Sequence, residues 1–124
     1  MTPLDTLRAR LPWRVRTAEW VDPTLVVGGD GWSMTISCSW RVCTPTGVAY
    51  GSSSVDAEDR VWDLVGAEVV GIEPQGVVSY ADPRLVLDGG LALELFSEAE
   101  PDAFVVRSGD DIVIVGPFPA GTWS

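Results

Sequence analysis

Large apolar residues recur at every second position in two segments of the chain, residues 32–37 and 91–96. An alternation with a period of two places every second side chain on the same face, which is typical of a β-strand buried on one side. A glycine-rich turn precedes each segment, at residues 28–31 and 88–90. Glycine supplies the positive φ angles that a tight hairpin needs. Each alternating segment is therefore predicted to be the second strand of a β-hairpin.

The strands that lead into these two turns resemble one another. Residues 22–27 read Asp-Pro-Thr-Leu-Val-Val, and residues 82–87, sixty positions later, read Asp-Pro-Arg-Leu-Val-Leu. Self-similarity at a fixed distance indicates a repeated structural unit. We interpret the chain as two pseudo-repeats, at about residues 2–53 and 55–116, followed by a C-terminal tail at 117–124.

The two units are expected to share one core in a single domain, residues 1–124. A unit of about sixty residues buries too little surface to be stable by itself. The predicted fold class is α+β, mainly β, with antiparallel sheets built from two repeated helix-plus-β-meander units. One continuous curved sheet, or two sheets packed face to face with the helices closing the ends, would both satisfy this pattern.

One helix is predicted at the start of each unit. Thr2 is a suitable N-cap and Pro3 suits the first helical position. The apolar side of this first helix is formed by Leu4, Leu7 and Leu11. A second helix is predicted over residues 56–64, where acidic residues of the first turn favour the positive end of the helix dipole. Its apolar side is predicted to contain Val61, Trp62 and Val65.

The six tryptophans are dispersed along the chain, and most of them are expected in the core. Two are predicted exceptions. Trp20 lies out of register with the apolar face of the strand predicted at residues 13–17. Trp123 lies in the C-terminal tail, which either docks back on the domain or reaches a partner.

The composition removes most catalytic chemistry. The 124 residues include 18 Asp and Glu against 8 basic residues, all Arg, and there is no Lys, His or Asn. Without an imidazole or a lysine amine, no Ser-His-Asp triad, Schiff base or histidine metal ligand can form. We therefore predict that the protein is not an enzyme and that it has no catalytic residue, no metal site and no cofactor.

Negative charge is concentrated in the second part of the chain. The net charge is −10, and residues 51–124 carry fourteen acidic residues against three arginines. Nucleic acids and anionic membranes would be repelled, so neither is expected as a partner. A basic protein would be attracted. The predicted contact residues belong to acidic turns and are Glu98, Glu100, Asp102, Asp110 and Asp111.

A cytoplasmic location is expected. The N-terminal residues lack the apolar core of a signal peptide. Cys38 and Cys43 would lie about 16 Å apart in an extended segment, which is too far for a disulfide bond. Both thiols are therefore expected to be reduced.

Three short patterns together resemble a known kind of bacterial domain. They are Leu64-Val65-Gly66-x-x-Val69, then Leu85-Val86-Leu87-Asp88-Gly89, and the closing strand Phe104-Val105-Val106. This order resembles small uncharacterised, actinobacterial-like domains in which "LVG..V" precedes "L.L.L.DG..L" and a tryptophan-containing strand. Phe104 replaces that tryptophan here, although Trp40 keeps it in the first unit. Some such domains are suspected immunity proteins of toxin systems, so the resemblance implies a protein-binding role and assigns no functional residue.

Three functions are compatible with these observations. The leading hypothesis is a non-enzymatic protein that binds another protein, such as a basic toxin or nuclease that it neutralises. The second is a small-molecule-binding β-domain with an apolar pocket lined by Trp and Leu between the two repeats. The third is a structural homodimer formed by pairing of exposed edge strands.

Overall fold

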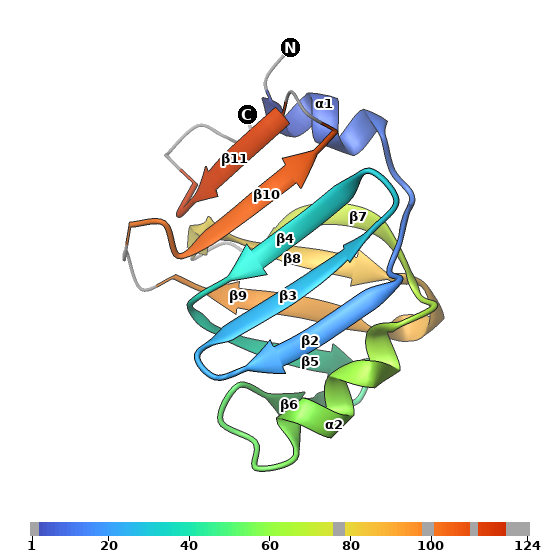
Figure 1. The fold of residues 1–124 in the computed structure, drawn as a ribbon, viewed down its shortest axis with the longest axis vertical. Coiled ribbons are helices and arrows are strands. Elements are labelled where there is room, and N and C mark those ends of the chain that lie inside the picture. The colour runs from blue at the N-terminus through green and yellow to red at the C-terminus, as the bar shows by residue number, and fades with distance from the viewer. Residues whose placement is uncertain (1–2, 76–78, 98–100, 110–111, 119–124) are drawn as a thin grey trace.

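The computed structural model describes residues 3–75, 79–97, 101–109 and 112–118, which form two antiparallel β-sheets and short helical segments (Figure 1). Sheet A has the strand order β1-β7-β8-β9-β5-β6, and sheet B has the order β11-β10-β4-β3-β2. The elements are α1 (Pro3–Ala9), β1 (Trp13–Arg14), β2 (Thr17–Val21), β3 (Thr24–Gly29), β4 (Trp32–Ile36), β5 (Ser39–Thr44), β6 (Gly47–Gly51), α2 (Ala57–Arg60), the 3-10 turn η1 (Val61–Leu64), β7 (Glu68–Gln75), β8 (Ser79–Leu87), the 3-10 turn η2 (Asp88–Gly90), β9 (Ala92–Phe96), β10 (Phe104–Ser108) and β11 (Ile112–Gly116).

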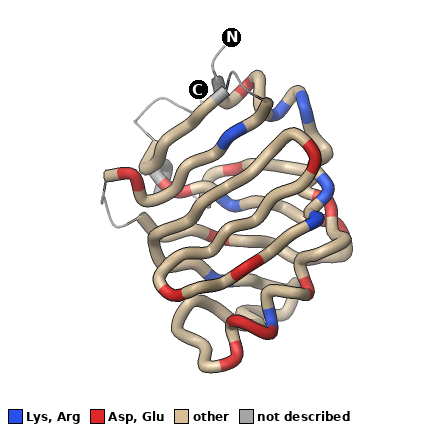
Figure 2. The backbone as a smooth tube through the Cα atoms, viewed as in Figure 1, with Lys and Arg blue, Asp and Glu red and all other residues tan. Residues whose placement is uncertain are grey.

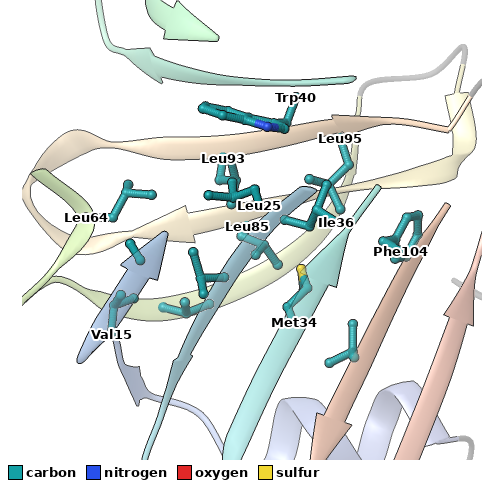
Figure 3. Close-up of a cluster of buried hydrophobic side chains, with 14 of the residues drawn as sticks. Val15, Leu25, Met34, Ile36, Trp40, Leu64, Leu85, Leu93, Leu95 and Phe104 are labelled. Carbon is teal, nitrogen blue, oxygen red and sulfur yellow. The ribbon is translucent and has the colours of Figure 1, made fainter. Parts of the chain in front are cut away.

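The two sheets pack face to face, and their inward side chains form the core between them (Figure 3). This arrangement confirms the predicted mainly β fold and selects two packed sheets over one continuous curved sheet. The largest side chains with almost no exposure include Leu25, Ile36 and Phe104 from sheet B and Trp40, Leu85 and Leu95 from sheet A. The tryptophan and leucine side chains between the sheets pack against one another in one cluster.

Both predicted hairpins are present. β3 pairs with β4 across a turn in which Gly31 has a φ of 75°, and β8 pairs with β9 across η2, where Gly89 also has a φ of 75°. Residues with a side chain rarely adopt this backbone conformation, so glycine is favoured at both positions.

The final hairpin of each unit crosses to the other sheet, which the pattern did not predict. β2, β3 and β4 belong to sheet B, but the following hairpin β5–β6 joins sheet A, where β5 pairs with β9. In the second unit, β7, β8 and β9 belong to sheet A, and the hairpin β10–β11 joins sheet B, where β10 pairs with β4. The strand order is thus equivalent in the two units, while a duplication of the sequence stays a prediction.

The helices lie at opposite ends of the sandwich (Figure 1). α1 contacts β11, and Leu4 and Leu7 are buried there as expected. α2 contacts β2 and β6 at the other end. None of the helices within the described residues is long and apolar enough to span a membrane.

The first residues after β11 pack against the core. Phe118 is buried and meets the Phe104 ring edge-on, with the ring centroids 5.2 Å apart. The tail therefore docks on the domain as far as Phe118. Trp123 lies outside the described residues. Cys38 and Cys43 are both free thiols.

Candidate functional site

A groove runs between strand β2 and the helical segment formed by α2 and η1. Its volume is about 460 Å³. Six consecutive residues, Arg16 to Val21, line one side, and Glu58 and Trp62 line the other. We call this feature the β2–α2 groove.

Trp62 is exposed beside this groove, and its predicted place in the core is wrong. Its relative exposure is 65%, whereas Val61 and Leu64 are buried. The reason is local geometry: the helix changes to a 3-10 turn at Val61, and a period of three residues places positions 61 and 64 on the same face. Trp62 and Val65, also exposed, fall on another face and are left at the surface.

Aromatic contacts link both walls of the groove to the core. Trp20, a predicted exposed residue, is half-buried and meets Trp40 edge-on at 5.4 Å between ring centroids. Trp40 in turn meets Tyr50 at 6.0 Å, and the Arg60 guanidinium of α2 lies 4.6 Å from the centre of the Tyr50 ring. Burial raises the pKa of Tyr50 to about 12, so its hydroxyl stays neutral at physiological pH. This series of contacts fixes the position of α2 relative to β2.

The charge at the β2–α2 groove is negative. Glu19 and Glu58 line it, and neither takes part in an ion pair with another described residue. Arg16, at one end of the groove, forms an exposed ion pair with Asp30 at 2.8 Å. Figure 2 shows the acidic positions along α2 and on the facing strand β2.

The structure describes one of the five predicted contact residues. Asp102 is exposed and has a φ of 57°. It lies two residues before Phe104, which is three strands from β2 in sheet B. Asp102 is thus not part of the β2–α2 groove. The other four, Glu98, Glu100, Asp110 and Asp111, lie outside the described residues.

A row of alternating charges crosses the outer face of sheet A. Cross-strand pairing places Glu73, Arg84, Glu94 and Arg41 side by side on β7, β8, β9 and β5. Glu94 is only 7% exposed, although its neighbours Leu93 and Leu95 face the core from the opposite side of the strand. Its carboxylate accepts hydrogen bonds from Arg41 and from the Cys43 thiol, and Arg84 lies 3.6 Å away.

These contacts have opposing effects on Glu94. Burial by itself raises the pKa of Glu94. The hydrogen bonds from Arg41 and Cys43 and the charges of Arg41 and Arg84 together lower it by more than burial raises it, so the pKa lies below its ordinary value. Burial and the neighbouring carboxylate raise the pKa of the Cys43 thiol, which keeps it protonated and a poor nucleophile. The row therefore holds four neighbouring strands of sheet A together.

Glu94→Gln is expected to lower the free energy of unfolding at pH 7 by about 2 kcal/mol, because two arginines lose their buried partner. A carboxylate with a lowered pKa stabilises the fold above its unfolded pKa, near 4.5, and this contribution disappears as the pH falls below that value. Urea titrations from pH 7 to pH 3 should show the difference between the two proteins shrinking with acidity. A constant difference over that range would contradict the role of the charge. Glu73→Gln is the matched control, because Glu73 is more than half exposed and should contribute less than about 0.5 kcal/mol.

Arginines gather around two adjoining pockets at the end of sheet B that carries the β3–β4 turn. The pockets measure about 400 and 340 Å³ and share Gly31, Trp32 and Gly109. Arg10 donates to the backbone oxygen and the hydroxyl of Ser108. Arg14, which also lines the larger pocket, lies 3.6 Å from Glu68. These arginines already serve to join α1 and β1 to neighbouring strands, so the pockets are weaker candidates than the β2–α2 groove.

Within the described residues, no group of three or more His, Cys, Asp or Glu is placed to hold a metal ion. Comparison with known proteins found no matching family model, no matching curated protein and no matching solved structure. The candidate site therefore depends on its own geometry.

Sequence reasoning missed Trp62. The signal that was present is the run of acidic residues around it, which marks one side of residues 56–63 as solvent-facing.

Proposed function

We propose that this protein is a non-enzymatic binding domain that holds a basic protein partner in the β2–α2 groove. The observation that carries this proposal is an exposed tryptophan, Trp62, on the helical wall of a groove whose other wall is an edge strand. Such a feature is unfavourable for an isolated protein, because a large apolar surface stays in contact with water.

Tryptophan is well suited to dominate the affinity of an interface. It buries a large area on binding, and it is enriched among the interface residues whose truncation to alanine costs the most binding free energy. Val21 lies at the end of β2 and is 62% exposed, so a second apolar side chain is available beside the groove. Apolar contact would supply affinity, while Glu19 and Glu58 would select a basic partner.

The charge of the whole chain supports the same class of partner. A net charge of −10 accelerates encounter with a basic protein and disfavours acidic ones. A basic toxin or nuclease is a partner of this kind, and neutralising it requires only that its working surface be covered. The free thiols of Cys38 and Cys43 fit a reducing compartment such as the cytoplasm.

Trp62→Ala is expected to weaken partner binding at least about 30-fold, a loss of about 2 kcal/mol, while changing stability by less than about 1 kcal/mol. The partner is captured from a lysate of the source cells at low salt and purified. Its dissociation constant is then measured by calorimetry for each variant and at two salt concentrations. Raising the salt should weaken binding, because screening reduces the attraction between the two charged surfaces.

Val113→Ala is the matched control. Val113 is 50% exposed on β11, the strand of sheet B farthest from β2. Its truncation should leave the dissociation constant within about twofold of the wild-type value. Equal effects of Trp62→Ala and Val113→Ala would show that the partner binds elsewhere.

A further inference from the structure

We propose that the partner occupies the β2–α2 groove as an added β-strand, with an extended basic segment pairing along the free edge of β2. This inference rests on the proposed function, since it names the form in which the partner binds. Strand addition to an exposed sheet edge obtains affinity from backbone hydrogen bonds and selectivity from alternate side chains.

The lining of the groove shows that it follows the edge of the strand. A cavity over one face of a sheet is lined by every second residue of a strand, because successive side chains point to opposite faces. Here all six residues from Arg16 to Val21 line the groove. At about 3.3 Å per residue, this run is long enough for a partner segment of about five residues.

Within the described part of the chain, β2 pairs with β3 alone. Alternate residues of an edge strand direct their N–H and C=O groups away from the single neighbour, where another strand can reach them. Because all of Arg16 to Val21 line the groove, these groups of β2 are placed toward it in the proposed binding mode. The edge strand and the groove are therefore the same feature.

The backbone also pairs just before β2, where the β1–β7 ladder of sheet A continues as far as Val15. The Val15 N–H donates to the Ala67 oxygen, and the Gly66 N–H donates to the Val15 oxygen, at 2.9 and 2.8 Å. The N–H of the next residue, Arg16, points the other way and donates to the Gly28 oxygen of β3. The pairing at Val15 therefore ends before β2 begins, and the lining of the groove starts at Arg16.

The charges select the occupant. Every second side chain of an added strand points to the side where Glu19 and Glu58 lie. These positions meet two carboxylates, so arginine or lysine is favoured there. Apolar residues at other positions can pack against Trp62. A second copy of this chain would bring Glu19 and further acidic residues toward Glu19 of the first, and two chains of charge −10 repel one another.

The test uses an eight-residue blocked peptide of alternating Val and Arg, followed by ¹H–¹⁵N NMR of the labelled full chain. We expect shifts and slowed hydrogen exchange at β2 amides, a shift of the Trp62 indole, and binding that is at least tenfold weaker when Glu replaces Arg. Two further peptides carry N-methyl groups on one or the other alternate set of residues. N-methylation removes the N–H donors, so one set should weaken binding at least tenfold and the other should have little effect.

Four outcomes are decisive. A difference between the two N-methylated peptides, together with weaker binding to Trp62→Ala, supports strand addition. Equal binding of both peptides overturns strand addition but leaves a side-chain-mediated partner site at Trp62 intact. No shift at β2 or Trp62 with about 5 mM peptide overturns strand addition, and the titration of the captured partner then judges the proposed function separately. A dimer in sedimentation whose formation prevents the peptide-induced shifts at β2 assigns the edge to a second copy and overturns the proposal.

Discussion

Phe104→Ala is expected to lower the free energy of unfolding by about 4 kcal/mol, the largest single effect predicted for this chain. Phe104 has no exposed surface and packs against Phe118 from the strand end beyond β11. It lies on β10, which joins the final hairpin of the second unit to the strands of the first. Removing the ring leaves a cavity where that hairpin meets the core. The surrounding strands cannot move in to fill it, because each is held in place by backbone hydrogen bonds to its neighbours.

The measurement is equilibrium unfolding in urea, followed by tryptophan fluorescence and circular dichroism. Val105→Ala is the matched control, because Val105 is adjacent in sequence and faces away from the core. It should cost less than about 1 kcal/mol. If Phe104→Ala and Val105→Ala shifted the transition equally, the assignment of Phe104 to a closely packed core would be wrong.

Gly116→Ala is expected to lower the free energy of unfolding by about 3 kcal/mol. A Cβ atom at Gly116 would overlap the ring carbons of Phe104, its cross-strand partner on β10. The backbone at this glycine has no need of a positive φ, so the cost comes from overpacking and not from backbone conformation.

The double variant separates this explanation from a general weakness of β11. In the Phe104→Ala background the ring is gone, and Gly116→Ala should then cost less than about 1 kcal/mol, a coupling of about 2 kcal/mol. Gly71→Ala is the control, because a Cβ there would make ordinary contact with Val86 on β8. Additive effects of the two substitutions would contradict the predicted overlap.

The proposed binding mode also gives a reason for the acidic residue of the β2 edge, Glu19. An exposed strand edge invites pairing with other copies of the same chain. Charge on the edge is one of the devices by which proteins prevent this pairing, and Glu19 occupies the middle of β2. In the proposed binding mode, the same carboxylate that discourages self-association would favour a basic partner, so one residue would serve both requirements.

The hairpins were predictable because their signals are local. The alternation of residues 32–36 identifies the buried face of β4, and the φ of Gly31 meets the requirement of the turn before it. The start of α1 at Pro3 is local in the same sense. Trp62 was misassigned because an apolar residue at helical spacing indicates core, whereas the change to a 3-10 turn at Val61 depends on how the segment packs against β2.

Glu94 illustrates a second limit. The alternation of β9 correctly places Leu93 and Leu95 toward the core, and it places Glu94 on the opposite face. That face was expected to be exposed, yet Glu94 is buried by Arg41 of β5 and Arg84 of β8. The register between strands decides which side chains meet, and a pattern within a single strand contains no information about that register.

By itself, the sequence determined the mainly β class, the positions of the hairpins and the acidic character of the surface. Each follows from the identity of neighbouring residues, through turn geometry, side-chain alternation or charge. Only the tertiary structure decided that each final hairpin crosses to the other sheet, and that residues 16–21 face Glu58 and Trp62 across one groove. These features arise from packing between segments about forty or more positions apart, and the free energy of such contacts depends on which surfaces cover one another.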